Sequence, residues 1–159
     1  MPEPRVTVRT VPETHGLGVR EKVTGPAGIG EVLADGFAGL QRVGAMVVGA
    51  PVAVYHDSEF RPERIDVEVV FPVSAWVKGP VATPGGRALE SRTVPGGRMA
   101  CASHVGGFAS ISDAYETLAA WVEEYGYRVS GPPRELYLSL LADPEPALTE
   151  VRLPVERVT

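Results

Sequence analysis

The chain contains an internal duplication. Shifting the sequence by 82 residues places residues 23–73 on residues 105–155 without a gap, and sixteen of those 51 positions are identical. The matches include turn-forming glycines and prolines and one tyrosine in each copy: Gly25/Gly107, Gly44/Gly126, Gly49/Gly131, Pro51/Pro133, Tyr55/Tyr137 and Pro72/Pro154. Two copies are too few for a solenoid, so the repeat predicts a domain with a pseudo-twofold axis.

Each copy has the pattern strand–strand–helix–strand–strand. Alternation of apolar and polar residues with a period of two indicates strands, and apolar residues at helical spacing follow Gly25-Pro26 and Ser110. The predicted strands are 5–11, 17–24, 52–57, 65–73, 88–94, 97–105, 134–140 and 148–155, and the predicted helices are 25–44 and 110–125.

This order predicts an α+β fold in a single domain covering residues 1–159. The first half runs from about 5 to 73, a Gly- and Pro-rich linker covers 74–87, and the second half runs from about 88 to 155. Two such halves can join edge to edge into one curved antiparallel sheet. Both helices are then expected on one face of the sheet and a ligand groove on the other.

Composition excludes several classes of protein. The formal net charge of -5 argues against a nucleic-acid or anionic-membrane surface and weakly favours cationic partners. The lone Cys101 excludes an internal disulfide and fits a reducing compartment. Because no apolar run approaches the roughly 20 residues of a membrane span, and the N-terminus has no apolar signal core, a cytoplasmic protein is expected.

The stretch Gly131–Leu138 carries the clearest functional signal. Strand alternation puts Glu135 and Tyr137 on one face, while the leucines between and after them suggest that the other face is the core. In the first copy the equivalent residues are Ala53 and Tyr55, so one acid has no counterpart. A carboxylate beside a phenol, present in only one of two otherwise similar repeats, predicts a site for a flat or cationic ligand.

The same parity argument extends the predicted groove. Its expected lining combines aromatic rings with small residues and a few polar groups: Phe37, Tyr55, Phe71, Trp76, Ala100, Ala102, His104, Phe108, Glu135 and Tyr137. A plain structural interpretation stands beside this one, with the tyrosines as core residues, Glu135 as a solvated strand residue and His104 as a structural histidine.

No motif predicts a cofactor or a metal. The three histidines are scattered, and no cysteine pair accompanies them. The segment Gly25–Gly30 is rich in glycine but lacks the Lys-Ser/Thr pair of a phosphate-binding loop, and no Gly-x-Ser-x-Gly motif is present. We therefore expect neither a metal nor a cofactor.

Several segments, in this order and spacing, resemble the GyrI-like small-molecule-binding domain, which also serves as the effector domain of AraC- and MerR-type transcription regulators. The segments are Pro51–Asp57, Ile65–Val73, Pro95–Ala100, His104–Phe108, Ala114–Trp121 and Gly131–Tyr137. The resemblance covers about Arg5 to Val155. The chain departs from the commonest motif at Gly107-Phe108, where Pro-Tyr is frequent.

The resemblance implies a duplicated fold with a central groove that binds bulky aromatic or cationic molecules. Glu135 matches the position of the family's acidic groove residue, and Phe37, Tyr55, Phe71 and Tyr137 match aromatic wall positions. The leading hypothesis is therefore binding of such a molecule, for sequestration of a toxin or drug or for sensing.

Two alternatives stay open. Some stand-alone members resemble hydrolases that open the cyclopropane ring of DNA-alkylating antibiotics. In that case Glu135 would be the general base for one water and Tyr137 a hydrogen-bond donor. The second alternative is an inhibitor-like protein whose groove holds a protein partner. Neither the ligand's identity nor the oligomeric state can be predicted.

Overall fold

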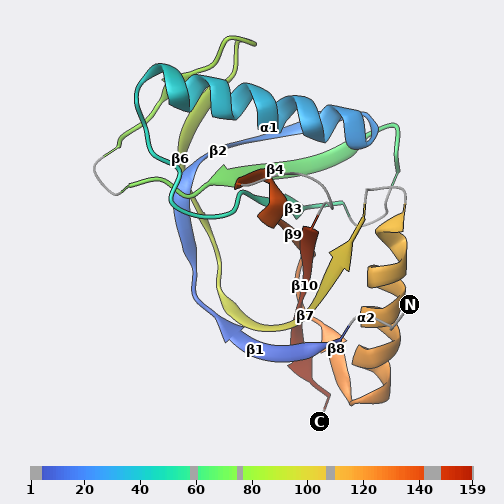
Figure 1. Ribbon diagram of the computed structural model, residues 1–159. Helices are drawn as coiled ribbons and strands as arrows, with labels where there is room; N and C mark the ends of the chain where they lie inside the picture. Colours follow the sequence, from blue (N-terminus) through green and yellow to red (C-terminus); the bar gives the residue numbers. More distant parts are fainter. Residues whose placement is uncertain (1–4, 58–60, 75–76, 107–109, 142–147, 159) are drawn as a thin grey trace. The chain divides into compact units, whose positions relative to one another are not determined.

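The computed structural model describes residues 5–57, 61–74, 77–106, 110–141 and 148–158. These residues form two helices and a set of strands that pair antiparallel, as an α+β fold requires (Figure 1). The strands are β1 (Thr7–Val11), β2 (Thr14–Val23), β3 (Val52–Tyr55), β4 (Ile65–Phe71), β5 (Val81–Ala82), β6 (Ala88–Val94), β7 (Gly97–Val105), β8 (Tyr127–Val129), β9 (Arg134–Tyr137) and β10 (Leu148–Arg157). The helices are α1 (Gly25–Arg42) and α2 (Ser112–Glu124), and a 3-10 turn covers Leu138–Leu141.

Most predicted elements are confirmed. The differences lie where a strand is too short to show alternation: β5 falls inside the predicted linker, and β8 follows the glycine that ends α2. The strand predicted over 134–140 ends at Tyr137, where the chain enters the 3-10 turn. None of the helices among the described residues is both long and apolar enough to cross a membrane.

The chain divides into two compact units whose boundaries differ from those of the two halves in the sequence. One unit contains residues 1–12 and 96–159, and the other contains residues 13–95. The two halves exchange their first strands. β1, from the first half, pairs with β7 of the second half, and β6, from the second half, pairs with β2 of the first half. A shift of 82 residues places β1 within β6, so the exchange occurs in both copies.

In unit 2 (residues 13–95) the strands pair in the order β3-β4-β2-β6-β5, and α1 packs on β2 and β4 (Figure 1). The ring of Phe71 lies under the helix, where a Cβ on Gly36 would stand 2.4 Å from it. The ring therefore requires a glycine at that position of α1.

In unit 1 (residues 1–12 and 96–159) the order is β1-β7-β10-β9, with β8 also paired to β10, and α2 packs on β7 and β10 (Figure 1). The positions of Gly36 and Phe71 are occupied here by Leu118 and Leu153, both buried. Two leucines replace a glycine and a phenylalanine, so the same space under the helix is filled in two ways.

The strand exchange is secured by one ion-pair cluster in each unit. Arg9 of β1 binds both carboxylate oxygens of Glu150 on β10, at 2.8 and 2.9 Å, and Arg152 Nε donates to the same carboxylate at 2.5 Å. At the repeat position, Glu68 accepts a hydrogen bond from Arg92 of the other exchanged strand at 3.1 Å and pairs with His56 at 2.9 Å. Both glutamate side chains are largely buried, at 14% and 13% exposed.

The carboxylate of Glu150 makes folding stability depend on pH. Burial alone would raise the pKa of Glu150, but hydrogen bonds from Arg9 and Arg152 outweigh it and hold the pKa below its usual value of 4.5. A lowered pKa in the folded state adds stability above the unfolded pKa, and that stability is lost as the pH falls through the folded pKa.

We predict that Glu150→Gln lowers the free energy of unfolding at pH 7 by about 1–2 kcal/mol, because the hydrogen bonds from Arg9 and Arg152 lose the charge that strengthens them. The difference from wild type should shrink as the pH falls below the ordinary pKa of 4.5, because the unfolded wild-type chain then takes up a proton that the folded carboxylate resists. Urea denaturation at several pH values measures both quantities. A constant difference from pH 7 to pH 3 would contradict this assignment.

Candidate functional site

The face of unit 1 that packs against α2 carries three rows of side chains, because residues directly opposite each other on paired strands share a face. One row is His104, Thr149 and Tyr137; the next is Ala102, Val151 and Glu135; the third is Ala100 and Leu153. Ala100, Ala102, Val151 and Leu153 form one apolar cluster with Ala114, Leu118 and Val122 of α2. The polar residues of the first two rows therefore lie at the margin of an apolar core.

Glu135 is the central polar residue of this face. Its side chain is buried, with the residue only 4% exposed, and its carboxylate accepts two phenolic hydrogen bonds. Tyr137 Oη donates to Oε1 at 2.9 Å, and Tyr115 Oη, from the second turn of α2, donates to Oε2 at 2.5 Å. The two phenols therefore supply hydrogen bonds to an acid that is shielded from water and lies beside an apolar cluster.

His104 lies in the same row as Tyr137, on the other side of Thr149, and is 7% exposed. Its Nε2 lies 3.1 Å from Ser110 Oγ, just ahead of α2. A Cβ on Gly106, whose φ is +133°, would stand 3.2 Å from that hydroxyl and 3.3 Å from the imidazole, so the turn needs a glycine. His104 thus ties the end of β7 to the start of α2.

Two predictions about this site are wrong: that its residues lie on the face away from the helices, and that the leucines of the strand after Arg134 face the core. Glu135, Tyr137, Ala100, Ala102 and His104 do share one face, but it is the face covered by α2, not the opposite one. Leu138 does not continue the strand and is 37% exposed. The leucine face was assigned to the core because it is the more hydrophobic face. The face of Glu135 is buried instead, because the carboxylate and the two phenols form hydrogen bonds with one another.

A one-residue change of register accounts for the placement of β7. In unit 2, Val19 lies opposite Val69, and the repeat predicts Cys101 opposite Val151. In the structure Ala102, not Cys101, lies opposite Val151. This shift of one residue turns each side chain of β7 to the face opposite the one that the repeat predicts.

The remaining predicted site residues belong to unit 2 or lie outside the described residues. Phe37 of α1 and Phe71 of β4 meet edge to face, with ring centroids 5.0 Å apart, inside the core under α1. Tyr55 lies opposite Val67, on the face that α1 covers, and is partly buried. Trp76 and Phe108 fall outside the described residues.

The residues predicted for the site do not include Tyr115, so its bond to Glu135 was missed. The repeat contained a signal that could have found it. At the equivalent positions of unit 2 stand Leu33 and Ala53, both buried and apolar, so the phenol and the acid replace apolar residues together. A paired change from apolar to polar at two buried positions indicates a contact.

We predict that Tyr115→Phe lowers the free energy of unfolding by about 1–3 kcal/mol, because a buried carboxylate loses a donor. The control is Tyr125→Phe near the end of α2, where the residue is 54% exposed and the ring that stacks on Trp121 is kept. That control should change stability by less than about 0.5 kcal/mol. Equal effects of the two substitutions in urea denaturation would show that the bond to Glu135 carries no stability.

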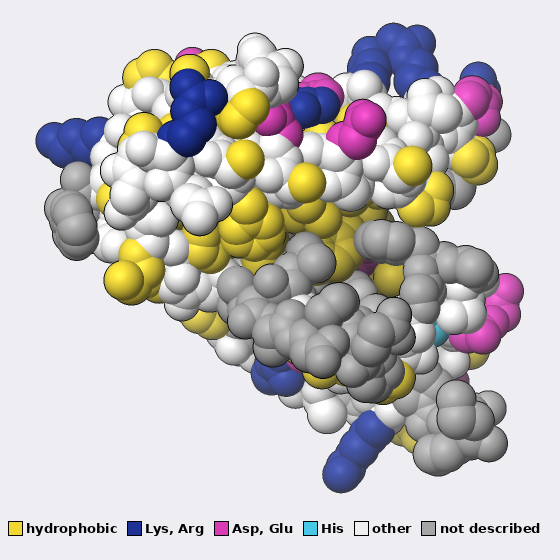
Figure 2. Space-filling view, turned by 45° about the horizontal axis from the view of Figure 1, so that its top comes forward, with side chains coloured by type: hydrophobic (Ala, Val, Ile, Leu, Met, Phe, Trp, Pro, Cys, Tyr) yellow, Lys and Arg dark blue, Asp and Glu magenta, His cyan; other side chains and the backbone are white. Residues whose placement is uncertain are grey.

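The surface and the described side chains add little to this site. On the face that Figure 2 shows, Lys and Arg lie interspersed with Asp and Glu, so the net negative charge does not gather there into one patch. Among the residues that the structure describes, no group of three or more His, Cys, Asp or Glu side chains is arranged to hold a metal ion.

The chain belongs to the family described as the GyrI-like small molecule binding domain, whose model matches residues 4–156. The expected resemblance is thereby confirmed. A comparison with curated proteins found no match.

Solved structures agree on the fold. The EcmrR C-terminal domain is 25% identical, with a TM-score of 0.81 over 98% of this chain and 99% of that one. EcmrR in a complex with DNA is 23% identical, with a TM-score of 0.83, and this chain spans 58% of its length.

More distant structures share the fold. A hydrolase encoded by lin2189 from Listeria innocua is 19% identical, with a TM-score of 0.61 over 98% of this chain and 93% of that one. SAV2435, solved bound to tetraphenylphosphonium, is 13% identical, with a TM-score of 0.54 over 96% and 94%. At these identities the likeness shows the fold alone and assigns no reaction to this chain.

Proposed function

We propose that this protein binds a bulky hydrophobic cation, with Glu135 supplying the charge that selects it. The observation that carries the proposal is the burial of an acid, 4% exposed, beside an apolar cluster and between two phenols. A buried carboxylate is costly to keep charged, and close contact with a cation offsets that cost. Small-molecule binding is the property of the family; the preference for cations is the proposal.

The surroundings of Glu135 suit such a ligand. Tyr115 and Tyr137 each reach one oxygen of the carboxylate, so two aromatic residues lie next to the acid, and aromatic rings attract cations. Ala100 and Ala102 occupy positions where unit 2 has Leu17 and Val19, so the side chains in the rows next to Glu135 are smaller than at the same positions of the other unit.

A structural relative supports the choice of ligand class. SAV2435 was solved with tetraphenylphosphonium, a rigid cation whose charge is enclosed by four phenyl rings. This chain has the same fold and a buried acid in place, which is the chemistry that such a cation requires. Sequestration of a toxic cation and sensing of one are both consistent with this binding.

We predict that the protein binds rhodamine 6G, a hydrophobic cationic dye, with micromolar affinity, and that Glu135→Gln weakens binding at least fivefold. The substitution keeps the size of the side chain and removes the charge that attracts the dye. Fluorescence anisotropy measures the affinity. The matched control is Glu116→Gln, an exposed acid on the same helix as Tyr115, which should bind as wild type does. Equal affinity of Glu135→Gln and wild type would remove Glu135 from recognition.

A further inference from the structure

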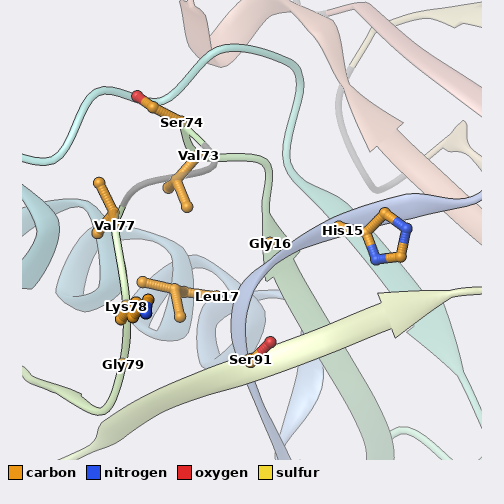
Figure 3. Close-up of a pocket in the computed structure, with 9 residues that line it drawn as sticks. All are labelled: His15, Gly16, Leu17, Val73, Ser74, Val77, Lys78, Gly79 and Ser91. Atoms are coloured by element: carbon orange, nitrogen blue, oxygen red, sulfur yellow. The ribbon is translucent and has the colours of Figure 1, made fainter.

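Unit 2 contains a pocket of about 420 Å³ that shares no residue with the Glu135 site. Strand β2 contributes His15, Gly16 and Leu17, strand β6 contributes Ser91, and the chain after β4 contributes Val73, Ser74 and residues 77–79 (Figure 3). The volume lies within the range of pockets that hold small organic ligands. All of these residues belong to one compact unit.

The apolar part of the pocket is formed by Leu17, Val73 and Val77. Leu17 is only 2% exposed, and its side chain points toward residues 77–79 (Figure 3). A Cβ on Gly79 would stand 3.0 Å from Leu17 Cδ2, so the backbone at Gly79 lies directly on this leucine. The pocket therefore has an apolar floor held by close contact between two segments.

The polar groups of the pocket favour a negative ligand. Lys78 supplies an ammonium group, and Ser74 and Ser91 supply hydroxyls that can donate hydrogen bonds. Ser91 lies directly opposite Leu17, so its hydroxyl stands beside the apolar floor. The imidazole of His15 lies 2.9 Å from both Thr93 Oγ1 and Glu13 Oε1, and its side chain is 67% exposed.

We propose that this pocket binds a small organic anion, with one or two rings on the floor of Leu17, Val73 and Val77 and a carboxylate or sulfonate at Lys78 and Ser91. The proposal is independent of the cation site, because the two sites lie in different units and require opposite charges. The molecule would then bind amphipathic ions of both signs, each in its own unit.

The test uses anilinonaphthalene sulfonate, whose fluorescence rises on binding, and the neutral N-phenyl-1-naphthylamine, which lacks the sulfonate. The sulfonate should bind the wild-type protein with one-to-one stoichiometry, and Lys78→Gln should weaken it at least fivefold. The neutral probe should bind wild type and Lys78→Gln equally. The matched control is Lys22→Gln on β2, which removes the same charge outside the pocket and should leave both affinities unchanged.

A second substitution tests the place of binding without changing the charge. Ser91→Phe should fill the pocket and reduce sulfonate binding more than tenfold, whereas Glu90→Phe, on the opposite face of β6, should have no effect. Circular dichroism checks that each variant is folded. Unchanged sulfonate binding in Lys78→Gln or in folded Ser91→Phe would overturn the proposal, as would loss of sulfonate binding in Glu135→Gln.

Discussion

The carboxylate of Glu135, held by two phenols, is the interaction on which the proposed function depends. A buried charge is tolerated only where strong hydrogen bonds replace water, and Tyr115 and Tyr137 provide them at 2.5 and 2.9 Å. Tyr115 comes from α2 and Tyr137 from β9, so the acid also ties the helix to the strands. Loss of either phenol should affect both stability and recognition.

The duplication explains how one unit could acquire this site without loss of the fold. Unit 2 has apolar residues at the two decisive positions, Ala53 and Leu33 in place of Glu135 and Tyr115, and it fills the space under its helix with Phe71 against Gly36. Unit 1 packs Leu118 and Leu153 there. The exchanged strands and their arginine–glutamate clusters are common to both units. The scaffold is therefore held by features that the two units share, while the chemistry lies where they differ.

Much of the fold could be predicted from the sequence because periodicity and the repeat are local and redundant. Nearly every long strand and both helices have the expected positions. The exchange of β1 and β6 could not be predicted, since both strands alternate in the same way and each fits either partner. The face of Glu135 was assigned wrongly for a similar reason: alternation reveals two faces but not which of them is buried, and the hydrogen bond from Tyr115 of α2 shows that the face of Glu135 is the buried one. The bond from Tyr115 of α2 depends on a tertiary contact, which alternation along the strand does not reveal.

The central claim is that the charge of Glu135 selects cations. The most direct measurement compares tetraphenylphosphonium with tetraphenylborate, two ions of nearly the same size and shape and opposite charge, by calorimetric titration. The Lys78→Gln variant is the appropriate background, because it removes the ammonium group from the pocket of unit 2. We expect the cation to bind at least tenfold more tightly than the anion, and Glu135→Gln to abolish this preference. Equal affinity for the two ions, or a preference that survives Glu135→Gln, would contradict the account.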